Sequence, residues 1–126
     1  MRAEQLALLE KAEHALEVAT LLRDRDHFDD AASKVYYAMF YGVKALLISV
    51  PGTSLKRHAT VIAAFREPWA QTNKIEPEYH RWIVSAFEAR GKADYMIGEA
   101  YEKEDADLHI THAEVMIRRV RELLET

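Results

Sequence analysis

Apolar residues recur every three or four positions along most of this chain, and no other feature of the sequence constrains its fold as strongly. This spacing places apolar side chains on one face of an α-helix, whereas a half-buried strand would need strict alternation. Only four glycines and three prolines interrupt the 126 residues, so long uninterrupted helices are expected. The pattern therefore predicts an all-α protein.

Five helical segments follow from this spacing and from the positions where it breaks. They cover about residues 3–22, 30–49, 54–67, 77–97 and 104–124. Asp29 is expected to be the N-cap of the second segment, and the run VPGT at 50–53 should end it. Four long helices and a shorter third one predict an up-and-down four-helix bundle with an additional short helix, formed by a single domain over residues 1–126.

The first segment has one apolar stripe, which begins with Leu6 and Leu9, but the segment 30–49 has two. The two stripes are Ala32, Val35, Met39, Gly42 and Leu46, and Tyr36, Phe40, Val43 and Leu47. Such a helix lies at the centre of a bundle or is shared between the core and an interface, which is one reason to expect a homodimer. Gly42 costs up to about 1 kcal/mol in mid-helix, so a close backbone approach is expected there.

Composition and charge narrow the class of protein. The formal net charge of -4 argues against a protein that coats nucleic acid through its overall field, but 17 Lys and Arg residues can still form a local basic site. The chain has no cysteine, and no apolar run is long enough to cross a bilayer. We therefore expect a cytoplasmic protein with no disulfide, no thiolate nucleophile and no membrane segment.

Arg90 lies on the apolar side of the fourth segment, in register with Ile83 and Phe87. A guanidinium group in such a position needs a polar partner. Asp94, four residues later, is in register for an ion pair, and Tyr95 adds a phenol beside it. One interpretation is a structural ion pair that fixes helix packing, and the spacing alone favours it. The other is a phosphate or anion site in which Arg90 offers its planar guanidinium.

His58 shares an apolar stripe with Ile62 and Phe65 in the third segment. Lys56 and Arg57 precede it, near the expected start of that helix. Basic residues and free backbone N–H groups at a helix start favour anions. Taken alone, a histidine on an apolar stripe is more typical of a hydrogen-bonded core residue.

Three further groups contain residue types that are used in sites but have simpler structural explanations. They are Asp105, His109 and His112; Arg118, Arg119 and Arg121; and Trp69 and Trp82. The histidine group lacks further metal ligands, so we expect a solvated helix face and no metal. The arginines complement the helix dipole, and the tryptophans should pack in the core or an interface. No phosphate-binding glycine loop or other cofactor motif is present, so no cofactor is expected.

Three segments together resemble the signature of HEPN domains, in particular the small stand-alone bacterial and archaeal group. SKVYYAMFY at 33–41, followed by KALL at 44–47, is similar to the second-helix signature of that group. KRHATVI at 56–62 is similar to its basic-histidine segment, and RGKADY at 90–95 to its motif of arginine, three residues and Asp-Tyr. The resemblance extends over about residues 30–98 and, more loosely, over both terminal helices.

The resemblance implies a helical bundle that dimerises, often with the motif arginines of two subunits near a shared cleft. Many HEPN proteins are metal-independent RNases of defence and toxin–antitoxin systems. Others are inactive RNA-binding or nucleotide-binding modules, and many work beside a small nucleotidyltransferase. The candidate site residues on this chain are Arg90, Asp94, Tyr95 and His58 for catalysis, and Tyr37, Lys56 and Arg57 for substrate binding.

The chain departs from the active RNases of the family at one position. Those proteins have a histidine four to six intervening residues after the arginine, where this chain has Tyr95, Met96 and Ile97. A metal-independent RNase needs one group for the ribose 2′-hydroxyl and another for the charged phosphorane. Arg90 suits the second role, whereas a free phenol, with a pKa near about 10, suits the first poorly. His58, from another helix, is the candidate to replace the missing histidine. Both an RNase and a non-catalytic module that partners a nucleotidyltransferase therefore stay open.

Overall fold

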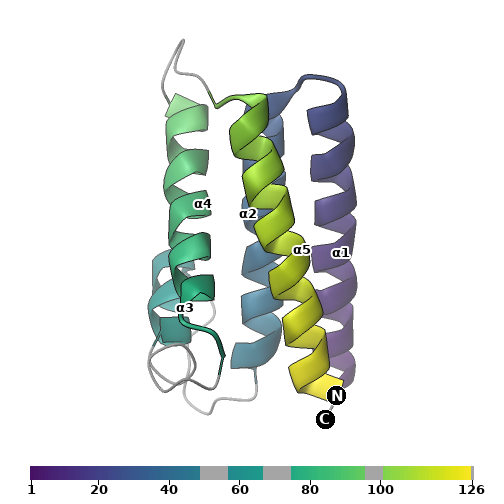
Figure 1. The fold of residues 1–126 in the computed structure, drawn as a ribbon. Helices are drawn as coiled ribbons and strands as arrows, with labels where there is room; N and C mark the ends of the chain where they lie inside the picture. The colour runs from purple at the N-terminus through teal and green to yellow at the C-terminus, as the bar shows by residue number, and fades with distance from the viewer. Residues whose placement is uncertain (49–56, 67–74, 96–100, 126) are drawn as a thin grey trace.

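The computed structural model describes residues 1–48, 57–66, 75–95 and 101–125, and its regular elements are all helices (Figure 1). In chain order they are α1 (Ala3–Asp24), α2 (Phe28–Leu47), α3 (His58–Phe65), α4 (Glu78–Tyr95) and α5 (Lys103–Glu125). Four long helices lie side by side, and the short α3 lies at one end beside α4 (Figure 1). The predicted all-α bundle is confirmed. No helix within the described ranges is long and apolar enough to cross a membrane.

The helix α2 is the centre of the bundle and packs against α1, α3, α4 and α5. Both of its predicted apolar stripes are buried within the single chain. The second stripe is therefore explained by the core and does not itself argue for a dimer. The predicted close backbone approach at Gly42 is wrong, because a Cβ atom there would lie 3.7 Å from Cγ1 of Ile117, an ordinary van der Waals contact.

The buried face of α1 begins one residue earlier than predicted. Leu6 is 42% exposed, whereas the neighbouring Gln5 is buried. The side-chain amide of Gln5 donates a 3.0 Å hydrogen bond to the carbonyl oxygen of Ala45 in α2, and its oxygen accepts one from the backbone N–H of Arg2. Gln5 can be buried because both ends of its amide are hydrogen-bonded. It thereby fixes α1 against α2.

The connection between α1 and α2 is shorter than predicted. Asp26 adopts a left-handed backbone (φ 64°) after the last turn of α1, a conformation that aspartate tolerates better than most residues. The backbone N–H of Asp26 donates to Arg23 and that of His27 to Leu22, the two bonds of a Schellman motif. Because this turn reverses the chain at once, His27 is the N-cap residue of α2. The prediction that Asp29 is the N-cap is wrong, since it lies in the first turn.

The start of α3 also differs from the prediction. Arg57 has an extended backbone (φ −113°, ψ 137°) and is the N-cap residue, so the helix begins at His58 rather than near residue 54. This start places His58 at the end of α3 that meets α2. Lys56, Trp69 and the predicted break at 50–53 lie outside the described residues.

Candidate functional site

Side chains from three helices meet on one side of α2. Tyr36, Tyr37 and Phe40 come from α2, His58 is the first residue of α3, and Arg90 comes from α4. The rings of all three α2 residues lie within 6 Å of the His58 ring centre, and Arg90 lies over the two tyrosines. We call these five residues the Arg90–His58 site.

The imidazole of His58 is held in one orientation by its neighbours. Its Nδ1 is 2.6 Å from the hydroxyl of Tyr36, within hydrogen-bond distance. Its ring stacks on Phe40, with centroids 4.2 Å apart and an interplanar angle of 17°, and Tyr37 meets it edge-on at 5.5 Å. Nε2 has no hydrogen-bond partner in the part of the chain that the structure describes.

Arg90 lies at the rim of the core rather than inside it. Its side chain is 29% exposed, and its guanidinium carbon is 5.3 Å from the ring centre of Tyr37 and 5.8 Å from that of Tyr36. These distances are typical of cation–π contacts. Its Nε is 3.4 Å from Oδ2 of Asp94, the predicted i,i+4 ion pair. Nε is nevertheless buried without a hydrogen bond to any described residue. The pair with Asp94 is loose, which leaves hydrogen-bonding capacity on Arg90.

Burial sets the protonation states of the site. It raises the pKa of the Tyr36 phenol well above its usual range, so Tyr36 stays neutral although Arg90 acts in the opposite direction. The pKa of His58 is lowered, mainly by burial and then by the positive charges of Arg90 and Lys44. His58 is therefore neutral near pH 7. A neutral imidazole beside a guanidinium can accept a proton from a ligand whose anionic group is bound by the arginine.

The predicted site residues are placed as follows. Asp94 and Tyr37 lie beside Arg90, and His58 contacts the same two tyrosines as Arg90. Arg57 is exposed next to His58. Lys56 and the side chain of Tyr95 lie outside the described residues.

Tyr36 and Phe40 were missed as site residues because their stripe on α2 predicts core packing, and both are buried. The hydroxyl of Tyr36 was the available signal, since a buried phenol requires a polar partner. That partner, His58, comes from a different helix and cannot be identified by spacing.

The prediction that His109 and His112 lie on a solvated face is wrong. His109 is buried, with Nδ1 2.7 Å from the Tyr101 hydroxyl and Nε2 3.5 Å from Oγ of Ser85. His112 stacks face to face on Trp82 with ring centres 4.0 Å apart. Both rings pack at the contact between α4 and α5, because this side of α5 faces the bundle. No group of three potential metal ligands occurs among the described residues.

The arginines near the end of α5 differ in their surroundings. Arg119 pairs with Glu76, with Nε 3.2 Å from the carboxylate, and Arg121 pairs with Glu13 of α1. Arg118 is exposed, without an ion pair among the described residues. Two of the three therefore form ion pairs with residues outside α5.

Comparison with known proteins gives a family match over nearly the whole chain. A family model described as the HEPN domain matches residues 5–123. A protein of Methanocaldococcus jannaschii named "Putative toxin" is 35% identical over 99% of this chain and 92% of its own length. A second protein of that organism with the same description is 32% identical over 93% of this chain and 79% of its own length. A UPF0332 protein of Thermotoga maritima is 32% identical over 91% of this chain and 86% of its own length.

Proposed function

The chain belongs to the HEPN domain family, and on that premise we propose that it binds RNA at the Arg90–His58 site and cleaves it without a metal ion. The observation that carries the proposal is that α2 brings Arg90 and His58 to the same pair of tyrosines, although the two residues are on different helices. His58 thus supplies a histidine near Arg90, although this chain has none at the family spacing after Arg90. The toxin names of two relatives are consistent with this activity.

In the proposed reaction Arg90 binds the scissile phosphate through its planar guanidinium. Nε2 of neutral His58 accepts the proton of the ribose 2′-hydroxyl as the 2′-oxygen attacks phosphorus. The bond from phosphorus to the 5′-oxygen then breaks and the 5′-oxygen takes up a proton from water, which leaves a 2′,3′-cyclic phosphate and a 5′-hydroxyl end, while His58 returns its proton to the solvent. Negative charge grows on the phosphorane during the attack, and Arg90 stabilises it. Tyr36 keeps the imidazole oriented through Nδ1.

The remaining predicted residues surround this centre. Asp94 positions Arg90 and is displaced in part when a phosphate binds, as expected for a loose and partly exposed pair. Tyr37 offers a ring on which a base can stack. Arg57 and Lys56 contact neighbouring phosphates, and Tyr95 belongs to the same proposed site. We also propose that two copies of the chain place their Arg90 side chains near a shared cleft.

The absence of histidine at residues 95–97 favours a second candidate function. In that case the protein is a non-catalytic helical module that binds RNA or a nucleotide and partners a small nucleotidyltransferase. The residues at the site are the same, but His58 then serves as a hydrogen-bonding group rather than as a base.

Cleavage of single-stranded RNA in the presence of EDTA tests the proposal. The wild type should leave 2′,3′-cyclic phosphate ends. Arg90→Ala should slow the reaction by about 10²–10³-fold, because the phosphorane loses its cation. His58→Gln should slow it by about 10²–10⁴-fold, because the general base is lost. Arg118→Ala is the matched control, since Arg118 is an exposed arginine on α5, and it should cleave at the wild-type rate.

Thermal unfolding of Arg90→Ala separates the proposal from a purely structural ion pair. Because the Arg90–Asp94 pair is partly exposed, its loss should cost no more than about 1 kcal/mol, and loss of the contacts with Tyr36 and Tyr37 should add about 0.5–1 kcal/mol. A loss of several kcal/mol would support the structural interpretation. Equal background cleavage by wild type and Arg90→Ala would rule out the enzymatic proposal. RNA binding that depends on Arg90, without cleavage by the wild type, would favour the non-catalytic module.

A further inference from the structure

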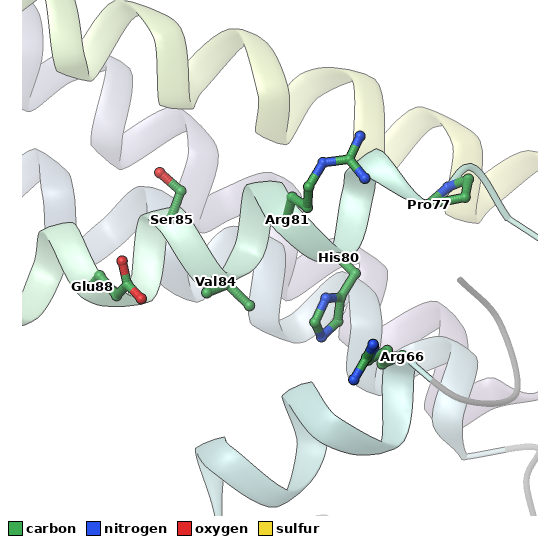
Figure 2. A pocket seen from close by; sticks show the side chains of 7 residues that line it. All are labelled: Arg66, Pro77, His80, Arg81, Val84, Ser85 and Glu88. Carbon is green, nitrogen blue, oxygen red and sulfur yellow. The ribbon is translucent and has the colours of Figure 1, made fainter. Parts of the chain in front are cut away.

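A pocket lies between the end of α3 and α4, outside the Arg90–His58 site (Figure 2). Its volume is about 630 Å³, within the range of small-molecule sites. Its lining residues are Arg66, Pro77, His80, Arg81, Val84, Ser85 and Glu88. None of them has a role in the reaction proposed above.

One end of this pocket is positively charged. Arg66 and Arg81 lie on either side of His80 (Figure 2). Both arginines are exposed, and neither forms an ion pair with any residue that the structure describes, whereas Arg119 and Arg121 are paired. The lowered pKa of His80 is caused first by burial and then by Arg66 and Arg81, so both guanidiniums act on the same ring. Two arginines beside one pocket, with no ion pair among the described residues, supply local positive charge that suits a phosphate on an acidic protein.

The rest of the pocket suits a nucleoside. Pro77 and Val84 supply apolar wall, and the Ser85 hydroxyl and the Glu88 carboxylate lie farther along α4 from the arginines (Figure 2). A carboxylate repels phosphate but accepts hydrogen bonds from the exocyclic amino group of a base. The charges therefore predict how a nucleotide is oriented in the pocket: its phosphate lies at the Arg66 and Arg81 end, and its base points toward Glu88.

The pocket and the Arg90–His58 site share the contact between α3 and α4. His58 begins α3 at the first site, whereas Phe65 near its end has its ring 6.3 Å from that of His80 at the pocket. Along α4, Arg81 and Arg90 are nine residues apart, which is about 13.5 Å along the helix axis and half a turn around it. A single RNA strand that contacts both arginines must therefore pass around α4 as well as along it.

We propose that this pocket binds one nucleoside monophosphate unit, and that this unit belongs to the RNA strand held at the Arg90–His58 site. The second half of the proposal rests on the proposed RNA-binding function. Arg66 and Arg81 contact the phosphate, while Ser85 and Glu88 accept hydrogen bonds from a base that carries an amino group. The pocket thereby selects the sequence a few nucleotides from the cleaved bond.

Titration with AMP tests the pocket without reference to RNA. In NMR spectra, the imidazole signals of His80, assigned with His80→Gln, should shift as AMP is added. They should not shift in the double variant Arg66→Ala/Arg81→Ala. UMP, which lacks the amino group, should bind several-fold more weakly than AMP, and Glu88→Ala should remove that difference. If the His80 signals do not shift at millimolar AMP, or if they shift equally in the double variant, the proposal that this pocket binds a nucleotide is wrong.

Binding of a short fluorescent single-stranded RNA, 2′-O-methylated to prevent cleavage, tests the link to the strand. Arg66→Ala/Arg81→Ala should weaken binding at least tenfold. It should also reduce the slope of log K against log salt by about 0.7, which corresponds to the loss of one neutralised phosphate on a single strand. Arg25→Ala/Arg118→Ala is the matched control, because it removes two exposed arginines elsewhere, and its affinity should stay within about twofold of wild type.

The outcomes distinguish the two proposals. If Arg90→Ala abolishes RNA binding while the pocket variant binds like the control, the link to the strand is wrong and the proposed function stands. If the wild type binds AMP at His80 but no RNA, the proposed function fails, and the pocket is a site for a free nucleotide. Loss of affinity in both the pocket variant and Arg90→Ala supports a strand that contacts both sites.

Discussion

Four histidines of this small protein have surroundings that favour the neutral imidazole. They are His58, His80, His109 and His112. For each, burial is the main cause of the lowered pKa, and nearby arginines add to it at the first two positions. At a site, such a ring can accept a proton while the neighbouring guanidinium binds an anion. In the bundle, the same rings make stability depend on pH.

We expect the bundle to lose stability as the pH falls below about 6.5, the pKa of histidine in an unfolded chain. Because the four folded-state pKa values are lower, the unfolded chain binds more protons than the folded one in this window. The histidine contribution is thus fully present above about 6.5 and is lost as the pH falls toward the folded values. The unfolding midpoint in urea should therefore be lower at about pH 5.5 than at about pH 7.5, where most carboxylates remain ionised in both conditions.

Replacement of single histidines gives the control for this pH effect. The wild type is the reference for the pH dependence of the urea midpoint. His109→Gln should reduce that dependence, because it removes a buried imidazole. A midpoint that is equal or higher at the lower pH would contradict the assignment of neutral histidines.

At the scale of elements, α2 determines where the site can form. Because it packs against all four other helices, its faces are divided between the core and the Arg90–His58 site. Tyr36 belongs to both, since its ring is buried while its hydroxyl reaches His58 of α3. The edge of Phe87 on α4 meets the same ring at 5.4 Å. The packing of α3 and α4 on α2 therefore also aligns the proposed catalytic groups.

Gly42→Ala should stabilise the protein by up to about 1 kcal/mol. Alanine has the higher helix propensity, and its added Cβ would meet Ile117 at an ordinary contact distance. Gly91→Ala is the matched control on α4, because a Cβ there meets nothing within 4 Å. Urea unfolding of both variants measures the effect. If Gly42→Ala were clearly less stable than wild type while Gly91→Ala was more stable, α2 and α5 would be packed more closely than the structure indicates.

At the scale of the whole molecule, the chain needs no second copy to bury the two stripes of α2. A homodimer must use other surfaces, and its support comes from the family rather than from the periodicity of α2. The proposed shared cleft would place two copies of the Arg90–His58 site close together. A strand that contacts both copies would then gain affinity through effective concentration.

Sedimentation equilibrium of the purified protein should give twice the 14.5 kDa mass of the chain across a dilution series. Co-expression with an adjacent nucleotidyltransferase gene should give a larger complex that co-purifies, if the partner hypothesis is correct. A monomer at every concentration would contradict the homodimer. A homodimer that retains no nucleotidyltransferase would remove the support for the partnered module.

Features that depend on neighbours within one helix could be read from the sequence. The helical class, the order of the five helices and the pair between Arg90 and Asp94 all follow from the repeat of an α-helix. The family motifs added the expectation that His58 belongs with Arg90. The first three features depend on residues close together in the sequence, and the fourth rests on the family resemblance. None of them required knowledge of how the helices pack.

Only the tertiary structure decided which side of each helix is buried and which distant residues meet. Gln5 rather than Leu6 is buried because α2 presents the Ala45 carbonyl to it. His109 is buried because α4 and Tyr101 cover it. His58 and Arg90 share two tyrosines because α3 and α4 both pack against α2. Each contact depends on how the packed helices are rotated and how far apart they lie. The 3.6-residue period of the sequence pattern does not determine either quantity.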